Sequence, residues 1–235
     1  MEIYVLVVVF ITSFIQSIFG VGVLLFGTPL LLISGYDFVD ALMILLPISL
    51  VINLFQITKS SMHINFLFYK KLLIYTIPSI ILLLIIAIKI NFNFSFFIGI
   101  FLLFISLKSL SPSIEKIIIF LFSFDRAYFL LMGIIHGLTN LGGSLLTSKI
   151  FSLEMDKDEK RATISLSYFT FALFQILTLI GVGKLIQINL GYLFVGLTVF
   201  LLTDFFVYKN IVNKKYDNLF AIFLFLSGCI LIFME

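Results

Sequence analysis

Long apolar runs, separated by short polar loops, constrain this chain more than any other feature of its sequence. A helix needs about 20 mainly apolar residues to cross the hydrocarbon core of a bilayer. Eight segments come close to that length or exceed it: residues 3–34, 38–58, 66–88, 92–110, 126–152, 160–182, 188–208 and 217–234. The pattern predicts an all-α membrane protein, a polytopic helical bundle in which residues 1–235 form a single integral membrane domain.

Composition excludes most other classes of protein. Hydrophobic residues make up 62% of the 235 residues and charged residues only 11%, whereas an ordinary soluble domain carries about 25% charged residues. The net charge of +3 is spread over short loops without a basic run, so we expect no nucleic-acid partner. The single cysteine, Cys229, excludes a disulfide framework or a thiolate metal cluster within one chain. Glu2 stands where a cleaved signal would be positively charged, which favours a retained first helix.

The segment that opens each half of the chain differs from the other six, which we expect to be single spans. Residues 3–34 would form one helix about 48 Å long, although the hydrocarbon core measures only ~30 Å. Gly20-Val21-Gly22 interrupts this segment, and residues 139–144 (TNLGGS) interrupt the segment 126–152. Each segment can therefore be one tilted crossing, or a re-entrant hairpin of two shorter helices that returns to its starting side.

The distribution of Lys and Arg distinguishes these two topologies. With two hairpins, 13 of the 15 Lys and Arg residues lie on one side of the membrane, and only Lys89 and Lys184 lie on the other. With two single crossings, the same residues divide 7 to 8. We therefore favour the hairpins, with the basic loops in the cytoplasm and both the N- and the C-terminus outside it.

The hairpin topology gives each half five helical pieces, so the second half begins on the opposite side of the membrane from the first. It predicts two inverted repeats, 1–112 and 113–235, each opening with a broken or re-entrant helical hairpin followed by three spans. Two alignments relate the halves: residues 14–31 (FIQSIFGVGVLLFGTPLL) with 134–151 (IIHGLTNLGGSLLTSKIF), and LFQI at 54–57 with LFQI at 173–176. Inverted repeats with broken helices are a recurring design of secondary transporters.

Three motifs at these positions are similar to those of a known family of membrane transporters. They are GVGVLLFGTPLLL (20–32), GLTNLGGSLL (137–146) and RATISLSY (161–168). In these motifs and in its layout, the chain resembles the TauE/SafE family of sulfite exporters and toluene-sulfonate uptake permeases. The resemblance implies a permease for small anions such as sulfite or organosulfonates, either ion-coupled or facilitative, in the cell membrane (plasma or inner). Val23 stands where the family pattern has a further glycine, and Lys149 stands where the second half would repeat Pro29.

Backbone amides at the helix breaks, and polar side chains inside the apolar segments, are candidates for a substrate site. A helix that starts at a break leaves several N–H groups unpaired, and the helix dipole adds to their attraction for an anion. Glycine lets a ligand approach the backbone closely, although it also serves tight helix packing. The candidate substrate-binding residues are Gln16, Ser17, Gly20, Gly22, Asn53, Gln56, His136, Thr139, Asn140, Gly142, Gly143, Ser144 and Gln175. For each polar side chain, a hydrogen bond within the packed bundle is the alternative role.

His136 is the one titratable side chain that we expect deep in the membrane. It can carry a proton during coupled transport, or it can be a neutral histidine that donates to a carbonyl. Lys149 and Arg161 are expected near the cytoplasmic mouth, where they attract anions or follow the positive-inside bias. Asp204 is expected to reach the interface, and residues 154–161 (EMDKDEKR) are expected to form a solvated loop that caps the next helix.

A secondary transporter of a small anion, working by alternating access between the two repeats, is the leading hypothesis. The alternatives are a structural or assembly subunit of a membrane complex and an intramembrane enzyme. His63 and His136 lie in different regions, and the sequence contains no evident metal-ligand cluster, so we expect no enzyme, no metal and no cofactor. The expected partners are a small anionic substrate and the lipid bilayer, with room for a coupling ion, either proton or sodium, and for a homodimer.

Overall fold

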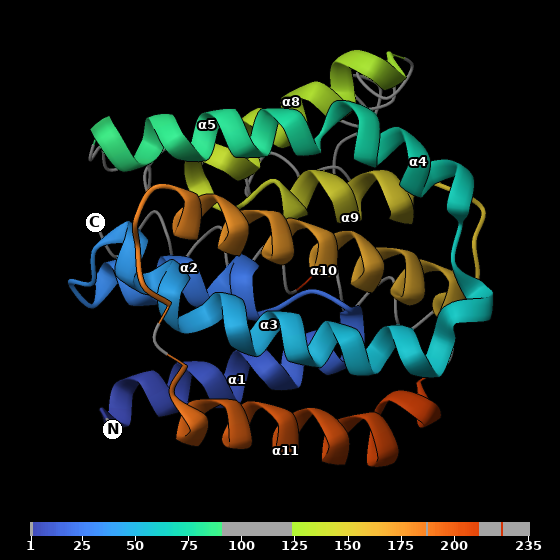
Figure 1. Ribbon diagram of the computed structural model, residues 1–235. Helices are drawn as coiled ribbons and strands as arrows, with labels where there is room; N and C mark the ends of the chain where they lie inside the picture. The colour runs from blue at the N-terminus through green and yellow to red at the C-terminus, as the bar shows by residue number, and fades with distance from the viewer. Residues whose placement is uncertain (1, 91–123, 187, 212–221, 223–235) are drawn as a thin grey trace.

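Helices are the only regular elements in the part of the chain that the computed structural model describes, residues 2–90, 124–186, 188–211 and 222 (Figure 1). They are α1 (Ile3–Phe19), α2 (Val23–Ile33), α3 (Phe38–Ser60), η1 (Ser61–His63), α4 (Phe66–Tyr75), α5 (Ile77–Ile90), α8 (Asp125–Thr139), α9 (Gly143–Phe151), α10 (Lys157–Gly181), α11 (Leu190–Phe206) and η3 (Tyr208–Asn210). The predicted all-α class is confirmed for these residues. The predicted spans 92–110 and 217–234 lie outside the described residues.

Three of the described helical segments are long and apolar enough to cross a membrane. They are Phe38–His63 (α3 with η1), Lys157–Gly181 (α10) and Leu190–Asn210 (α11 with η3), in agreement with the predicted spans 38–58, 160–182 and 188–208. A fourth crossing results if α4 and α5, which are bent by 41°, are counted as one span. Pro78 accounts for this bend, because proline has no N–H to donate to the carbonyl four residues earlier and its ring crowds that carbonyl.

Side-chain caps begin three of the described helices where a polar loop meets an apolar run: α4 at Asn65, α10 at Asp156 and α11 at Asn189. Asn65 Oδ1 accepts a hydrogen bond from the Phe68 amide (3.0 Å), and Asp156 Oδ1 accepts one from the Glu159 amide (2.7 Å). Such caps satisfy amides that a helix leaves unpaired in its first turn. The cap predicted for residues 154–161 is therefore confirmed at Asp156. The expectation that this whole run is a solvated loop is wrong, because α10 begins at Lys157, and Lys160 and Arg161 are buried.

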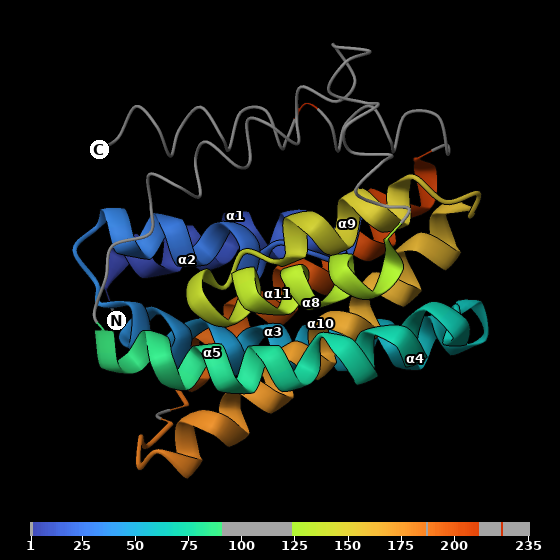
Figure 2. The same cartoon turned by 90° about the horizontal axis from the view of Figure 1, so that it is seen from above.

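The helices pack in layers that bring the two halves of the chain together. α1 packs against α11 in one outer layer, and α5 packs against α8 in the other (Figure 1). α3 and α10 pack against each other between these pairs. α10 crosses the bundle obliquely (Figure 2), so its successive turns contact different elements, among them α3, α4, α5 and α9.

Each opening segment is a hairpin of two helices. The hydroxyl of Tyr4, in the first turn of α1, donates to the Leu30 carbonyl near the end of α2 (2.8 Å). In the second hairpin, Lys149 Nζ near the end of α9 lies 2.9 Å from a carboxylate oxygen of Asp125, the first residue of α8. A bond between the start of one helix and the end of the next requires the chain to return to its starting point. One continuous helix across residues 3–34 is therefore excluded.

Residues that tolerate unusual backbone geometry make both turns, at positions 120 residues apart. Gly20 has a φ of +76° and Asn140 a φ of +62°, and glycine and asparagine adopt this left-handed region more readily than other residues. A side chain on Gly22 would collide with the backbone of α1, and one on Gly142 would collide with the backbone of α8. Larger residues at these two positions would push each returning helix away from its partner.

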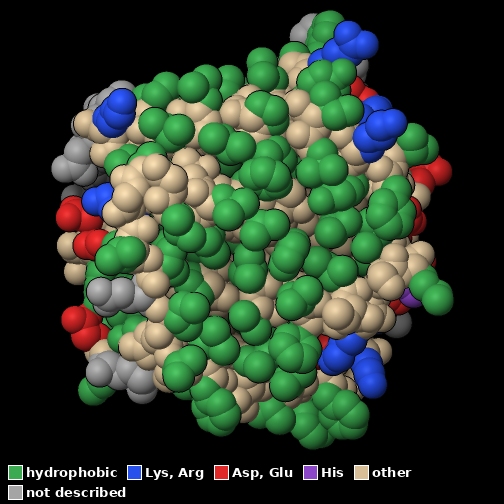
Figure 3. Space-filling view, viewed as in Figure 1, with side chains coloured by type: hydrophobic (Ala, Val, Ile, Leu, Met, Phe, Trp, Pro, Cys, Tyr) green, Lys and Arg blue, Asp and Glu red, His purple; other side chains and the backbone are tan. Residues whose placement is uncertain are grey.

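Charged side chains gather at the two ends of the bundle and leave an apolar belt between them (Figure 3). We call one end the basic end, because most described Lys and Arg residues lie there: Lys59, Lys70, Lys71, Arg126, Lys149, Lys157, Lys160, Arg161 and Lys209. Contacts across this end join Lys59 to Asp204, Lys71 to Asp125 and Asn65 to Glu159. Large apolar side chains in the belt are exposed, for example Phe10, Leu82 and Phe194. A bilayer would cover this surface, which water would not solvate favourably.

Candidate functional site

The first helix break is closed by amide side chains. Gln16, in the last turn of α1, donates from Nε2 to Asn53 Oδ1 (3.1 Å) and accepts at Oε1 from the amide of Val23, the first residue of α2 (2.9 Å). Asn53 donates to Ser49 Oγ (3.1 Å), and Gln56 donates to the Gln16 carbonyl (3.0 Å). The start of α2 is therefore capped by a side chain from α1, and α3 holds both helices.

Ser165 on α10 completes what we call the first-break network, formed by Gln16, Ser49, Asn53, Gln56 and Ser165. Its hydroxyl lies 3.1 Å from Gln56 Oε1 and 2.7 Å from the Arg161 carbonyl. All three amide nitrogens donate and the oxygens of Gln16 and Asn53 accept within the network, while Gln56 Oε1 shares the Ser165 hydroxyl proton with the Arg161 carbonyl. A buried polar network in which every member is satisfied rigidifies its surroundings. The first break is therefore a fixed joint.

The second break gathers His136, Asn140, Tyr168 and Gln175, which we call the second-break cluster. Asn140 donates from Nδ2 to Thr28 Oγ1 on α2 (2.7 Å), and Gln175 donates from Nε2 to Asn140 Oδ1 (3.1 Å). The Tyr168 ring stands nearly perpendicular to the His136 ring, with the centroids 6.1 Å apart. These residues come from the second hairpin and from α10, so the cluster lies between them.

The start of α9 lies against the Tyr168 hydroxyl. A Cβ on Gly143, the first residue of α9, would overlap that oxygen, so only glycine leaves room for the tyrosine in this position. The N-cap residue of α9 is Gly142, which has no side chain to cap the helix. The first turn of a helix carries unpaired amides and the positive end of the helix dipole. The Ser144 amide donates to the Leu141 carbonyl (3.0 Å), so what lies beside the Tyr168 hydroxyl is chiefly the positive end of the helix dipole.

Four buried polar atoms of the second-break cluster have no hydrogen-bond partner within the described structure. They are both ring nitrogens of His136, the hydroxyl oxygen of Tyr168 and Oε1 of Gln175, on side chains that are fully buried. Each unsatisfied buried group costs about 1–3 kcal/mol, and most buried polar atoms in proteins have a partner. Four such atoms in one place form a setting that can receive a polar ligand.

Three of the predicted site residues donate their hydroxyl protons to backbone carbonyls, one across to α11 and two within their own hairpin. Ser17 donates to the Phe200 carbonyl on α11 (3.0 Å), outside the first-break network. Thr139 and Ser144 donate to backbone carbonyls three or four residues earlier in the chain (2.6 and 2.8 Å). Short hydroxyl side chains commonly form such bonds with their own backbone. At these positions the backbone, more than the hydroxyl, is what the second break offers to a ligand.

α10 carries two contact residues that sequence reasoning missed, Ser165 at the first break and Tyr168 at the second. The predicted Gln175 also lies on α10, at the second break. Residues three, four or seven positions apart share one face of a helix, and the polar side chains of Arg161, Ser165, Tyr168 and Gln175 follow this spacing. That polar stripe was the signal available in the sequence. Ser165 and Gln175 are separated by about 15 Å along α10, so the two breaks lie at successive levels of one helix.

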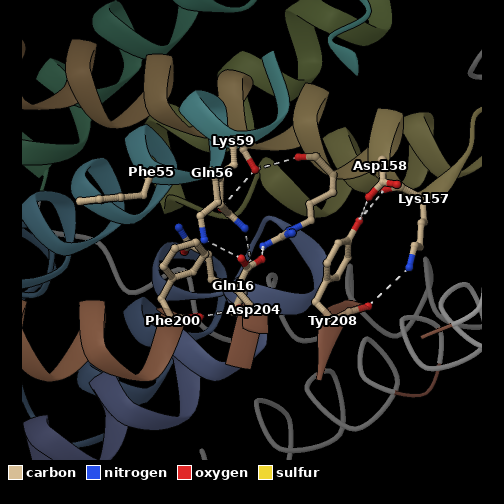
Figure 4. A network of polar contacts seen from close by, with 12 residues as sticks. Gln16, Phe55, Gln56, Lys59, Lys157, Asp158, Phe200, Asp204 and Tyr208 are labelled. Atoms are coloured by element: carbon tan, nitrogen blue, oxygen red, sulfur yellow. Dashed lines mark hydrogen bonds and ion pairs between the residues drawn. The ribbon is translucent and has the colours of Figure 1, made fainter. Parts of the chain in front are cut away.

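An ion cluster lies at the basic end, one turn of α10 from Ser165 (Figure 4). Asp204 accepts from Arg161 Nη2 (2.6 Å) and from Lys59 Nζ (2.7 Å). The Arg161 guanidinium carbon lies 3.8 Å from the centroid of the Tyr208 ring. Asp204 is only 6% exposed, so the expectation that it reaches the interface is wrong. The two cations hold its carboxylate inside the bundle, as burial of a charge requires.

Asp125 closes the second hairpin at the same end. Its carboxylate accepts hydrogen bonds from Lys71 and Lys149, and these bonds hold the pKa of Asp125 below its ordinary value. The Asp125 side chain is 39% exposed, so solvent weakens the attraction. Among the described residues, no three His, Cys, Asp or Glu side chains gather as a metal site requires.

The long apolar helices and the apolar belt between charged ends define a multi-pass membrane protein, and the first described segment of each half is a broken hairpin. The family model described as sulfite exporter TauE/SafE matches residues 5–231, nearly the whole chain. The chain therefore belongs to the TauE/SafE sulfite exporter family, and the resemblance of its three motifs is confirmed. Members of this family are membrane transporters and not enzymes. The chain matches no curated protein and no solved structure.

Proposed function

We propose that the protein carries a small sulfur oxyanion, sulfite or an organosulfonate, across the cell membrane, and that the anion binds at the second-break cluster. The observation that carries this proposal is the unpartnered Tyr168 hydroxyl and His136 ring at the start of α9, whereas the unpartnered Oε1 of Gln175 is an acceptor and offers an anion no hydrogen bond. An oxyanion accepts several hydrogen bonds at once, and a tyrosine hydroxyl, an imidazole N–H and helix amides are suitable donors.

The absence of a cation from this cluster suits a carrier better than a storage site. The residues of the second-break cluster are uncharged apart from the titratable His136, so an anion there is held by hydrogen bonds and by the dipole of α9. The space beside Gly142 is filled by α8 and the space beside Gly143 by the Tyr168 hydroxyl, so the anion would reach the start of α9 through that hydroxyl. A site of this kind binds without a fixed opposite charge, and the anion can leave again on the far side.

We also infer that the halves 1–112 and 113–235 are inverted repeats that exchange access to this site. α1 packs against α11, and its counterpart α8 packs against α5, which is the same relation with the halves exchanged. Gln56 and Gln175, which share the LFQI motif, each bond to the hairpin of their own half: Gln56 to Gln16, and Gln175 to Asn140. These reciprocal contacts support a rocking motion of one half against the other.

In this proposal the basic end faces the cytoplasm, as the bias of Lys and Arg favours. Two exposed positions test it: Ser34 lies between α2 and α3 at the opposite end, and Met62, in η1 at the basic end, is 97% exposed. In a Cys229→Ser background, a membrane-impermeant maleimide added to intact cells is expected to label Ser34→Cys and not Met62→Cys. Labelling of Met62→Cys from outside would contradict the topology.

Transport itself is tested with the purified protein as the only protein in liposomes. We expect saturable uptake of ³⁵S-sulfite down an imposed gradient, with competition by an organosulfonate, and loss of both in His136→Phe. Tyr69→Phe is a matched aromatic control, because Tyr69 bonds to Thr170 outside the cluster. Uptake no faster than in protein-free liposomes would contradict the proposal and favour a non-transporting assembly subunit.

A further inference from the structure

The ion cluster at the basic end, formed by Lys59, Arg161 and Asp204, has an excess of positive charge. Arg161 and Lys59 bond to different oxygens of the one Asp204 carboxylate (2.6 and 2.7 Å). The Arg161 and Asp204 side chains are only 7% and 8% exposed, whereas Lys59 is 49% exposed. The buried pair of Arg161 and Asp204 is balanced one to one, and the extra positive charge lies on the half-exposed Lys59, where water reaches it. A further carboxylate, Asp158, accepts a hydrogen bond from the Tyr208 hydroxyl (2.6 Å). The cluster is therefore suited to an exchange of one anion for another more than to an added anion.

Arg161 uses only part of its hydrogen-bonding capacity on Asp204. A guanidinium group carries five N–H donors in a planar fork that matches paired oxygens. The Arg161 Nε is buried and has no partner among the described residues. The Tyr208 ring covers one face of the guanidinium, with 3.8 Å between the guanidinium carbon and the ring centroid. Stacking on Tyr208 thus fixes the plane of the Arg161 guanidinium group, while its Nε–H makes no hydrogen bond among the described residues.

We propose that Arg161 and Lys59 form a second oxyanion site, which the Asp204 carboxylate occupies when no substrate is bound there. Sulfite and sulfonates present paired oxygens as a carboxylate does, and they carry a third oxygen that can accept from Nε. This inference relies on the proposed function only for the chemical class of the anion. The second-break cluster lies elsewhere along α10, so an anion uses this second site as it passes the basic end.

Displacement of Asp204 has a structural consequence. Lys59 belongs to α3, Arg161 to α10 and Asp204 to α11, so the carboxylate joins three helices. When an oxyanion takes over the two cations, α11 is released from the other two helices. The backbone of Arg161 also accepts a hydrogen bond from Ser165 of the first-break network (2.7 Å). Replacement of Asp204 by an oxyanion would thus weaken the contacts of α11 with α3 and α10 at the basic end, close to the first hairpin.

Asp204→Asn isolates the site, because it preserves the size of the side chain and removes the internal anion. We expect sulfite and sulfate, added at constant ionic strength, to raise the melting temperature of the purified variant, with half the effect at a concentration at least tenfold lower than in wild type. A ligand that binds only the folded state stabilises it by mass action. Chloride at the same ionic strength is expected to have no such effect, because it lacks paired oxygens.

Asp125→Asn is the matched control for this experiment. It removes a carboxylate that also joins two cations at the basic end, but both cations are lysines. We expect its response to oxyanions to equal that of wild type, and the response of Asp204→Asn to disappear in Asp204→Asn/Arg161→Gln. An equal gain in Asp125→Asn, or a gain that survives the loss of Arg161, would overturn the second site.

His136→Phe separates this inference from the proposed function. In Asp204→Asn/His136→Phe the oxyanion response is expected to persist, since it arises at Arg161; its loss would assign all binding to the second-break cluster and overturn the second site alone. If Asp204→Asn does not fold, Lys59→Gln replaces it, because it removes the positive excess at a half-exposed position. Its KM for sulfite supplied at the basic end is expected to rise at least threefold, and an unchanged KM contradicts the inference.

Discussion

The two helix breaks of this protein, at residues 20–22 and 140–142, turn the chain in the same way but use their polar side chains differently. Gln16 and His136 occupy the same position in the two hairpins, four residues before the left-handed residue of each turn. Gln16 caps the first residue of α2 and bonds to Asn53. Neither ring nitrogen of His136 has a partner within the described structure.

This difference shows how one backbone design can serve two purposes within a chain. At the first break, every amide group of the network is engaged within the protein, so the joint is stable but has little to offer a ligand. At the second break, Gly143 admits the Tyr168 hydroxyl where the first hairpin has Val23, and that hydroxyl and the His136 ring remain without partners within the described structure. This contrast is why we propose that the anion binds at the second break, which is the less satisfied of the two.

Gln16→Leu is expected to cause the largest change, a loss of stability. It leaves the Val23 amide and Asn53 Oδ1 buried without partners, and two such groups lower the free energy of unfolding by roughly 2–6 kcal/mol. His136→Leu leaves no partner behind, and its stability is expected to stay within about 1 kcal/mol of wild type. Unfolding of the purified variants in detergent measures both. An equal loss of unfolding free energy in Gln16→Leu and His136→Leu would contradict the claim that only the first break has its polar groups satisfied.

Tyr168→Phe is expected to weaken sulfite binding with little effect on stability. The hydroxyl has no partner within the described structure, but in the proposed complex it donates to an anion, a bond worth about 1.5–3 kcal/mol. Affinity should therefore fall by roughly 10–100-fold, as measured by calorimetric titration. Tyr69→Phe should lose about 1 kcal/mol of stability and keep the wild-type affinity. Unchanged affinity in Tyr168→Phe would remove this residue from the site.

Gly143→Ala is expected to displace Tyr168 from the start of α9. The added methyl group overlaps the hydroxyl, and overpacking of this kind costs about 1–3 kcal/mol, part of which should appear as an approximately tenfold weaker affinity for sulfite. Gly181→Ala is the control, because a methyl group added at this position on α10 would meet no atom within 4 Å. A Gly143→Ala protein that binds as Gly181→Ala does would show that this close contact is not needed.

The smallest expected effect concerns the acid dependence of stability at the basic end. Because hydrogen bonds from Lys71 and Lys149 lower the pKa of Asp125 in the folded protein, this carboxylate adds stability above its ordinary pKa. That contribution is lost as the pH falls through the lowered pKa, and it amounts to less than about 1 kcal/mol for a partly exposed pair. Acid unfolding of Asp125→Asn should be correspondingly less steep. Identical acid profiles would contradict the pairing.

Local features of the sequence were enough to predict much of the fold. Apolar length predicted α3, α10 and α11, and the glycines at 20–22 and 142–143 predicted the two breaks, because span length and helix interruption depend on neighbouring residues. The polar contacts between helices were harder to predict from the sequence. Asn140 meets Thr28 across 112 positions and Asp204 meets Arg161 across 43, and such pairs depend on how whole helices pack. Nothing in the sequence indicated that Asp204 is buried, because the two cations that pair with it lie on other helices, far away in the chain.

Binding of the anion at the second break is tested most directly with the two histidines of the chain, one of which serves as the probe and the other as the reference. In protein labelled with ¹⁵N-histidine, His136 reports on the second-break cluster, and His63 in η1 reports on the basic end; His63→Gln assigns the signals. Titration with sulfite at fixed pH and ionic strength is expected to shift the His136 ring signals saturably and to leave those of His63 in place. A His136 signal that stays unchanged while the protein transports sulfite would contradict the claim that the anion binds at the second break.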